Sequence, residues 1–190
     1  MEKPQTKGQI QEKEGEWQMG VVTGPDSNRE QKLTRLVEQY QTSLRRMCYA
    51  ILRDEELAKD AVQETFLKVY RTMDTFRNEC SEKTWLMRIA VNTCRDIRRS
   101  AWFRHIERRI TPEELLEPIQ QTEDEHVELT LAIMRMPKHL MEVTLLYYYQ
   151  DMTMRETAEA LGISLSTVSK RLTRAQAKLR DSLEGRDLHE

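Results

Sequence analysis

Two helices around a tight turn are predicted by the stretch Asp151-Met-Thr-Met-Arg-Glu-Thr-Ala-Glu-Ala-Leu-Gly-Ile-Ser-Leu-Ser-Thr-Val-Ser-Lys-Arg-Leu-Thr-Arg-Ala-Gln-Ala-Lys-Leu-Arg180. Thr153 and Glu156 have capping-box spacing, so the first helix is expected to begin at Met154. Gly162 is placed to end that helix, because glycine adopts the left-handed backbone conformation at little steric cost. Ser164 is placed to cap the second helix.

The second helix is expected to have one apolar and one basic face. The apolar positions recur every three or four residues and are Leu165, Val168, Leu172, Ala175 and Leu179. The basic positions are Lys170, Arg171, Arg174, Lys178 and Arg180. A short helix, a glycine turn and a longer basic helix are typical of a DNA-binding helix-turn-helix. The alternative is that the basic face is only exposed to solvent and binds no partner.

Composition favours an all-α protein. Hydrophobic residues make up 38% and charged residues 33% of 190 residues, a polar balance that still permits one or two folded domains. The chain has only six glycines and five prolines, and no strand-like alternation of useful length. The sequence contains no apolar run of about 18 residues, the length that a membrane span needs, and no signal-peptide core at its start. We therefore expect no stable insertion into a membrane and a cytoplasmic location.

The net charge of -2 conceals an uneven distribution. Residues 29–99 hold 15 Lys/Arg and 11 Asp/Glu, a net of +4, whereas residues 100–128 hold 3 and 8, a net of -5. Charges act locally, within a Debye length of roughly 8 Å. A basic segment followed by an acidic connector is therefore compatible with nucleic-acid binding despite the negative total.

Cysteine and histidine positions argue against a metal site. Cys48, Cys80 and Cys94 form no CxxC pair, and the four histidines are scattered, so no cofactor or metal is expected. Cys48 and Cys94 fall on apolar helix faces and are predicted to pack in the core. Cys80 falls in a predicted loop, where a redox sensor remains an alternative to a plain surface thiol.

The chain divides into five segments. Residues 1–28 hold four of the six glycines and are expected to be a disordered extension. Residues 29–100 form a predicted helical domain, 101–126 an acidic linker, 127–183 a second helical domain that contains the helix-turn-helix, and 184–190 a tail. Two small helical domains joined by an acidic linker are the expected architecture.

Three helices are predicted in the first domain. One runs from about Arg29 to Leu52, and Asp54 and Ser81 are placed to cap the next two. The second helix is expected to bury Ala58, Ala61, Val62, Thr65, Phe66 and Val69, and the third to bury Trp85, Leu86, Ile89, Ala90, Thr93 and Ile97.

The second domain is expected to begin with two more helices. Leu129, Ile133 and Met136 suggest the apolar side of one helix, and Pro137 is placed as the first residue of the next. The run Tyr147-Tyr-Tyr149 is predicted to pack in the core, with base stacking as the alternative.

Two regions resemble bacterial sigma factors, the promoter-specificity subunits of RNA polymerase. Three segments resemble region 2 of that family, namely Asp60-Ala-Val-Gln-Glu-Thr-Phe-Leu-Lys-Val-Tyr70, Thr75-Phe-Arg77 and Thr84-Trp-Leu-Met-Arg-Ile-Ala-Val-Asn92. Two further segments resemble region 4, namely Met136-Pro137 and Thr167-Val-Ser-Lys-Arg-Leu-Thr-Arg-Ala175. The order of the motifs and the short linker between them are similar to the extracytoplasmic-function (ECF) group.

The resemblance implies a protein that binds core RNA polymerase and promoter DNA and is not an enzyme. It implies that Asp60, Gln63 and Glu64 meet the clamp helices of the largest catalytic subunit. It also implies regulation by an anti-sigma factor that covers one or both domains.

The resemblance further implies two promoter contacts. Region 2 would open the -10 element and hold an unpaired base, through Arg77, Asn78, Glu79, Cys80, Ser81, Arg88, Asn92 and Arg95. Region 4 would place its second helix in the major groove at the -35 element, through Ser166, Thr167, Lys170, Arg171 and Arg174. Ser166, Lys170 and Arg174 fall on successive turns and are the best candidates for reading base edges. Residues 79–83 differ from the small and aromatic residues that many relatives have at this place. The resemblance therefore does not imply which base is captured.

Two other functions are alternatives. A transcriptional regulator that does not join polymerase would bind duplex DNA alone, as a dimer on paired half-sites. A DNA-processing enzyme would need a nucleophile with supporting arginines, or metal-binding carboxylates. The region 2 motifs argue against the first, and the scattered histidines and carboxylates argue against the second.

Overall fold

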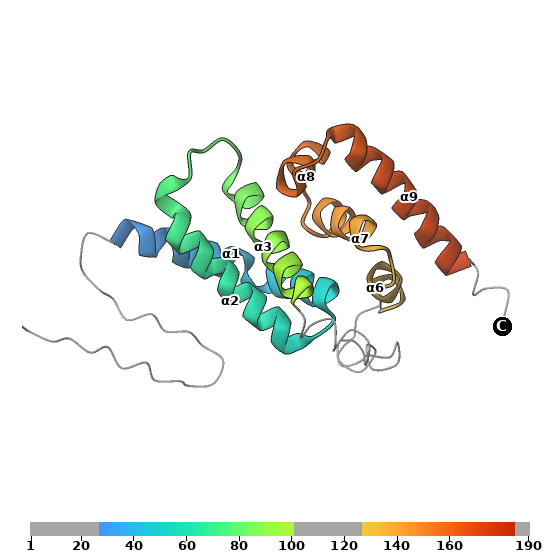
Figure 1. Cartoon of the computed structure of the whole chain (residues 1–190), viewed down its shortest axis with the longest axis horizontal. Helices are drawn as coiled ribbons and strands as arrows, with labels where there is room; N and C mark the ends of the chain where they lie inside the picture. Colours follow the sequence, from blue (N-terminus) through green and yellow to red (C-terminus); the bar gives the residue numbers. More distant parts are fainter. Residues whose placement is uncertain (1–26, 101–126, 185–190) are drawn as a thin grey trace, which may run out of the picture.

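The computed structural model describes residues 27–100 and 127–184, and every regular element in these two ranges is helical (Figure 1). The first domain contains α1 (Ser27–Leu52), α2 (Glu55–Thr72), the short 3-10 turn η1 (Met73–Thr75) and α3 (Glu82–Arg99). The second contains α6 (Val127–Met134), α7 (Lys138–Thr144), the π-helical turn η2 (Leu145–Tyr149), α8 (Met154–Leu161) and α9 (Leu165–Glu184).

The all-α prediction with two domains is confirmed for these ranges. The expected acidic linker, and nearly all of the expected N-terminal extension and C-terminal tail, lie outside the described residues. Helix α1 begins at Ser27, two residues before the predicted start.

Both predicted caps of the first domain form. The Leu57 amide donates to Asp54 Oδ1 at 2.8 Å, and the Thr84 amide donates to Ser81 Oγ at 3.1 Å. These bonds satisfy amides at the starts of α2 and α3 that have no partner within their own helix.

The buried face of α2 is as predicted, and that of α3 is confirmed at Leu86, Ala90, Thr93 and Cys94 but not at every predicted position. Trp85, Ile89 and Ile97 are only half-buried. Met87 and Val91, which the prediction left out, are buried on α3 as well. The reason is that α3 packs between two sets of neighbours, with α1 and α2 on one side and α8 of the second domain on the other. A single amphipathic stripe cannot describe a helix with two packed sides.

The predicted helical hairpin is present in detail. Thr153 and Glu156 form a complete capping box, with the Glu156 amide donating to Thr153 Oγ1 at 3.2 Å and the Thr153 amide donating to Glu156 Oε2 at 2.9 Å. Gly162 has φ +66° and ends α8. Val168, Leu172 and Ala175 are buried, so the apolar face of α9 is confirmed at these positions, but Leu165 is 51% exposed. Leu165 is the first residue of α9 and precedes the first packed position.

The π-helical turn explains two wrong expectations. Tyr148 and Tyr149 are exposed and do not pack in the core. The Gln150 amide donates to the Leu145 carbonyl at 2.9 Å, a five-residue step that widens the helix and rotates the residues that follow. A buried face that is predicted from 3.6 residues per turn is therefore wrong for this segment. Tyr148 Oη instead accepts a hydrogen bond from Gln176 of α9 at 2.6 Å.

The first two helices of the second domain also differ in detail from the prediction. Pro137 precedes α7 as its N-cap and is not its first residue, and its carbonyl accepts from the Leu140 and Met141 amides. On α6, Leu131 and Met134 are buried while Leu129 is exposed. The two domains share one hydrophobic cluster, which extends from Leu36 to Ala175.

Candidate nucleic-acid interface

The solvent-facing side of α9 carries the predicted base-reading residues. Ser166, Lys170 and Arg174 are exposed, whereas Thr167 and Arg171 are half-buried. The spacing of four residues places the three exposed side chains on successive turns of one side of the helix. The structure therefore brings together the residues that the sequence assigned to a major groove.

The hydroxyl groups at the start of α9 bond to one another. Ser164 Oγ lies 3.0 Å from Ser166 Oγ and 2.8 Å from Thr167 Oγ1, and it also accepts from the Thr167 amide at 3.2 Å. Lys170 and Arg174 make no ion pair with any residue in the described ranges. The cations are thus the side chains of this face that are least committed to local structure.

The loop between η1 and α3 is fixed by an aromatic pair. The rings of Phe76 and Trp85 stack with their centroids 4.6 Å apart and their planes at 21°. The ammonium of Lys32 on α1 lies 5.3 Å from the centre of the Phe76 ring, within the range of a cation–π contact. One face of each ring is thus taken by the other ring, and Lys32 lies over Phe76.

Salt bridges from α1 hold the start of α3. Lys32 Nζ lies 2.9 Å from Glu82 Oε1, and Arg35 Nη2 lies 2.5 Å from Glu82 Oε2. The hydrogen bond from Lys32, supported by that from Arg35, lowers the pKa of the Glu82 carboxyl against the opposing effect of burial. The loop that ends at Ser81 is therefore anchored at its start by Phe76 and at its end by Glu82.

The middle of that loop is open to solvent. Arg77, Asn78 and Glu79 are exposed, and Asn78 adopts φ +56°, a left-handed conformation that asparagine tolerates better than most residues. Cys80 is half-buried, and burial raises the pKa of its thiol despite the opposing charge of Arg88. A raised pKa disfavours the reactive thiolate, so the redox-sensor alternative gains no support.

The candidate -10 residues on α3 face the second domain. Arg95 Nε and Nη2 donate to Glu142 Oε1 and Oε2 on α7 at 3.0 and 2.7 Å. Arg88 Nε donates to the Glu159 carbonyl of α8 at 3.2 Å, while Asn92 between them is exposed. Sequence reasoning missed both partners, which lie 47 and 71 residues away along the chain. No periodicity or motif within one sequence signals such a pairing.

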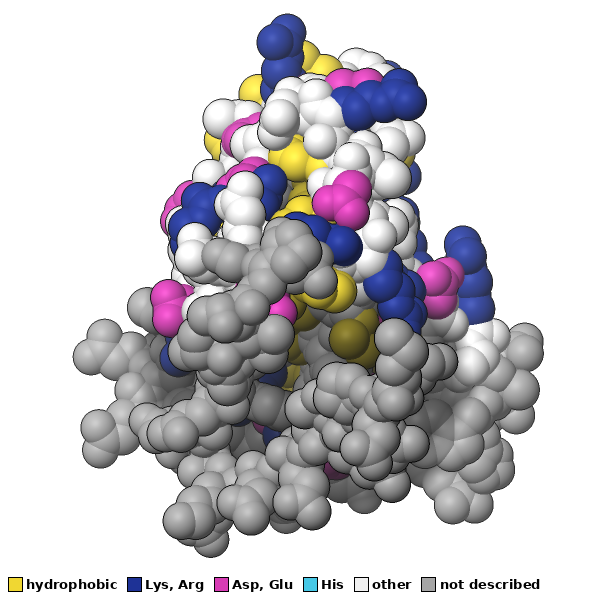
Figure 2. Space-filling model, turned by 90° about the vertical axis from the view of Figure 1, so that its left-hand side faces the viewer, with side chains coloured by type: hydrophobic (Ala, Val, Ile, Leu, Met, Phe, Trp, Pro, Cys, Tyr) yellow, Lys and Arg dark blue, Asp and Glu magenta, His cyan; other side chains and the backbone are white. Residues whose placement is uncertain are grey.

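The outer side of α2 carries the candidate polymerase contacts. Asp60 and Gln63 are exposed, and Glu64 is half-buried at 3.7 Å from Lys68 Nζ. The spacing of three and four residues places them on one side of the helix. On the face of the molecule in Figure 2, Lys and Arg side chains alternate with Asp and Glu and do not form one continuous basic field.

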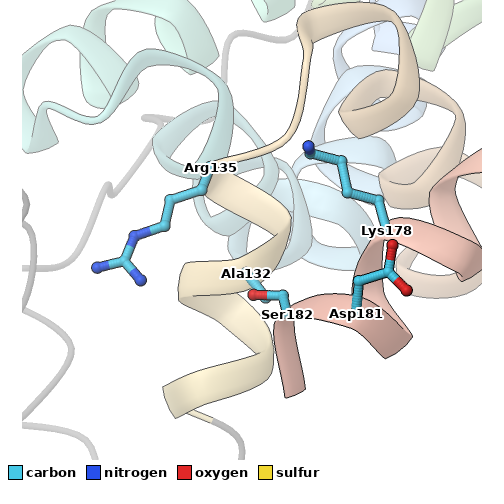
Figure 3. Close-up of a pocket in the computed structure, with 5 residues that line it drawn as sticks. All are labelled: Ala132, Arg135, Lys178, Asp181 and Ser182. Atoms are coloured by element: carbon cyan, nitrogen blue, oxygen red, sulfur yellow. The ribbon is translucent and has the colours of Figure 1, made fainter. Parts of the chain in front are cut away.

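A shallow hollow of about 360 Å³ lies between α6 and α9 (Figure 3). It is lined by Ala132, Arg135, Lys178, Asp181 and Ser182, and the Arg135 side chain points away from Lys178 and Asp181. None of the candidate site residues lines it. Across the two described ranges, no group of three or more His, Cys, Asp or Glu residues is arranged to hold a metal ion. None of the helices in these ranges has the length and apolarity that crossing a bilayer requires.

Family models match both domains of the chain. Sigma-70 region 2 matches residues 36–104, and Sigma-70 region 4 matches residues 126–179. The two matches cover the domains that hold α2, α3 and the helical hairpin.

Relatives of similar length match most of the chain. The ECF RNA polymerase sigma factor SigW of Bacillus subtilis (strain 168) is 30% identical over 167 residues, which cover 80% of this chain and 88% of SigW. The RNA polymerase sigma-E factor of Streptomyces coelicolor is 30% identical over 154 residues, which cover 78% of this chain and 84% of that protein.

Two solved structures share the arrangement of helices. CnrH, in complex with the cytosolic domain of CnrY, superposes with a TM-score of 0.63 and is 25% identical over 82% of this chain and 90% of CnrH. The sigma factor RpoE of Bartonella quintana, in complex with the anti-sigma factor NepR, gives a TM-score of 0.60 at 16% identity over 81% and 98% of the two chains and supports the fold alone. Sigma factors are not enzymes but subunits that bind core RNA polymerase and promoter DNA, and this chain belongs to the ECF group of RNA polymerase sigma factors, which direct transcription initiation.

Proposed function

We propose that residues 29–100 dock on core polymerase and open the -10 element, and that residues 127–183 bind the -35 element. The observation that carries this division is the distribution of exposed groups. Acidic and polar groups are exposed on α2, a polar loop is exposed before α3, and a basic face is exposed on α9. The first domain thus offers one surface to polymerase and one to DNA, and the second offers a surface to DNA. Polymerase links the two DNA contacts to one promoter.

The polymerase contact on α2 consists of Asp60, Gln63 and Glu64. Asp60 forms no ion pair within the described ranges, so its charge is free to meet a basic partner. Glu64 shares its charge with Lys68 and contributes less. The clamp helices of the largest catalytic subunit are the partner that sigma factors of this family meet through the corresponding helix.

The -10 contact combines the loop and the basic side of α3. An extruded base needs hydrogen-bond partners for its exposed edges, and a single strand needs nearby positive charge. The exposed side chains of Arg77, Asn78 and Glu79, together with Ser81 and half-buried Cys80, supply the polar groups. Arg88, Asn92 and Arg95 supply the charge and a further amide. The loop is held at both ends, so these groups lose little freedom when a base binds.

The -35 contact places α9 in the major groove. Lys170 and Arg174 are the strongest candidates for base edges, with Ser166 one turn closer to the start of the helix. An arginine paired with guanine discriminates against other bases by about 1–3 kcal/mol. Thr167 and Arg171 lie at the edge of this face, and Arg171 fits a phosphate better than a base edge.

The sigma factor is expected to act in the cytoplasm and to be held inactive by an anti-sigma factor. In support, RpoE of Bartonella quintana, which has the same fold, is bound by the anti-sigma factor NepR. A pull-down from cells tests this regulation. It should recover polymerase under inducing conditions and an inhibitor otherwise, and recovery of polymerase alone in every condition would contradict it.

Transcription from purified parts tests the main proposal. Core polymerase with this protein should start transcripts from a subset of templates in a promoter library, and the selected templates should share two sequence blocks at a fixed spacing. A library from which a known sigma factor selects promoters and this protein selects none would refute the proposal. Strand cleavage without polymerase would instead support the DNA-processing alternative.

A further inference from the structure

The first turns of α1 contact both ends of the candidate -10 loop, residues 76–81. Arg29 contacts the turn before this loop, and Lys32 and Arg35 contact the start of α3 after it. A spacing of three residues makes the three side chains neighbours on successive turns of the helix. They precede residue 36, at which the match to Sigma-70 region 2 begins. The part of the chain that makes these contacts thus lies just outside the matched domain.

Arg29 fixes the chain where it enters the loop. Its Nη2 donates to the Tyr70 carbonyl in the last turn of α2 at 2.8 Å, and its guanidinium carbon lies 4.6 Å from the centre of the Tyr70 ring. Its Nη1 lies 3.2 Å from Asp74 Oδ2 in η1. The Phe76 amide in turn donates to the Met73 carbonyl of η1 at 3.2 Å. One side chain thus ties the end of α2, and the turn that leads into the loop, to α1.

Lys32 joins the two ends of the loop to each other. Its ammonium lies 2.9 Å from Glu82 Oε1 at the start of α3 and 5.3 Å from the centre of the Phe76 ring at the start of the loop. Arg35 Nη2 lies 2.5 Å from the other carboxylate oxygen of Glu82. The side chains of Lys32 and Glu82 are only 28% and 29% exposed, so water and salt screen their attraction less than that of a fully exposed pair.

The side chains between these anchors are open to a ligand. Arg77, Asn78 and Glu79 are exposed, and their side chains make no hydrogen bond or ion pair with another described residue. Ordering a mobile loop around a base would cost conformational entropy, and anchors at both ends remove part of that cost before the base arrives. The loop therefore presents available polar groups on a backbone whose two ends are already fixed.

We propose that Arg29, Lys32 and Arg35 are positioning residues for promoter opening, which hold the two ends of the loop at the separation in which residues 77–81 fit one extruded base of the -10 element. The proposal rests on the proposed -10 role of this loop and adds the residues that make the loop selective. They act through the protein groups that they hold and touch no DNA. A loosened loop would still attract the strand by its charge, but it would distinguish the captured base from an empty position less well.

A binding assay measures this selectivity with the full chain in complex with core polymerase. The probe is the single non-template strand of a promoter that this protein selects, and further probes carry an abasic site at each position of the -10 block in turn. For the unaltered protein, an abasic site at one position should weaken binding about tenfold or more, the effect of losing hydrogen bonds to the captured base. The ratio of the two dissociation constants at that position is the selectivity of the loop. Partial unfolding lowers both affinities equally and leaves this ratio unchanged, whereas a badly positioned loop lowers the ratio.

Glu82→Gln separates positioning from direct contact with DNA. It removes the carboxylate that Lys32 and Arg35 hold but leaves both cations in place, so any direct contact of these cations with a phosphate would be kept or strengthened. Positioning predicts instead that the selectivity falls about threefold, the effect of losing partly exposed ion pairs. Glu55→Gln is the matched control, because it removes a carboxylate of α2 that lies 3.8 Å from Arg45, at the end of α1 away from the loop. This control should keep the selectivity of the unaltered protein.

Two variants at Lys32 test whether its positive charge is what matters. Lys32→Arg keeps a cation that can bond to Glu82 and lie over the Phe76 ring, so it should keep the selectivity. Lys32→Gln loses both contacts and should lower it. Circular dichroism checks that each variant is helical, and equal selectivity of the two variants would overturn the role of Lys32.

The outcomes distinguish this proposal from the proposed function. If the protein directs transcription and captures a base, but Glu82→Gln is as selective as Glu55→Gln, the positioning role is wrong and the sigma function stands. If the protein directs transcription but no abasic site weakens binding, the loop captures no base and the positioning role falls with it. If the protein initiates at no promoter, the proposed function itself fails.

Discussion

Arg95 on α3 forms a two-bond salt bridge with Glu142 on α7, so a residue assigned to promoter DNA is joined to the other domain of the same chain. The hydrogen bond with Glu142 raises the pKa of the Arg95 guanidinium above its already high ordinary value, against the effect of burial. Arg95 is therefore positively charged in this contact.

The strength of this pair can be measured by a double-mutant cycle. Arg95→Ala and Glu142→Ala should each lower the free energy of unfolding, and the coupling between them should be about 1.5–3 kcal/mol, as for hydrogen bonds to charged groups. Urea denaturation of the four proteins gives this number. Additive effects of the two substitutions would mean that the contact contributes nothing to the packed state.

A substitution at Gly162 should weaken the helical hairpin through the backbone alone. A Cβ atom at this position would meet nothing within 4 Å, but φ is +66°. Gly162→Ala should therefore cost about 1–2 kcal/mol, the penalty of the left-handed conformation for a residue with a side chain. Gly162→Asn should cost less, because asparagine tolerates this region better. Thermal unfolding compares the three proteins, and equal losses for both variants would indicate a steric cause.

The salt bridges of Glu82 should make stability depend on acid pH. Because the folded-state pKa of Glu82 is lowered, its contribution is fully present above the unfolded-state pKa near 4.5 and is lost as pH falls through the folded-state value. Glu82→Gln should therefore be less stable than the unaltered protein at pH 7, and the difference should shrink below about pH 4. Glu38→Gln on α1 is the control, and an identical pH profile for both variants would contradict the role of Lys32 and Arg35.

Charge reversal on α2 should weaken the contact with polymerase. Asp60→Lys replaces an exposed carboxylate and should reduce the affinity for core polymerase by about tenfold or more, through loss of attraction and new repulsion. Glu38→Lys makes the same charge change at an exposed position of α1 and should have little effect. Both affinities can be measured by fluorescence anisotropy of labelled protein. If both variants lost affinity equally, the contact would lie elsewhere or would depend only on the net charge of the protein.

The sequence predicted local structure well and contacts between distant residues poorly. The caps at Asp54, Ser81 and Thr153 and the left-handed Gly162 could be predicted, because each depends on residues within one turn of a helix. The exposure of Tyr148 could not, since it follows from a π-helical turn that breaks the 3.6-residue period. The burial of Met87 and Val91 likewise follows from packing on two sides of α3.

Some features of the candidate site could likewise be predicted from the sequence, and others could not. The basic face of α9 could be read from spacing, and it is exposed as expected at Lys170 and Arg174. The partners of Arg88 and Arg95 could not be read, because they depend on how two domains meet. Residues that look like a free basic surface in the sequence are thus partly covered in the folded chain.

The division of labour between the two domains is tested most directly by run-off transcription with core polymerase on a selected promoter. Four templates are needed, namely the intact promoter, one with the -35 block scrambled, one with the -10 block scrambled, and one with both scrambled. The unaltered protein and Arg174→Ala are compared on all four. Scrambling the -35 block should reduce transcription strongly for the unaltered protein and much less for Arg174→Ala, which has already lost that contact, while both proteins should depend on the -10 block. Equal sensitivity of Arg174→Ala and the unaltered protein to the -35 block would contradict the assignment of α9 to that element.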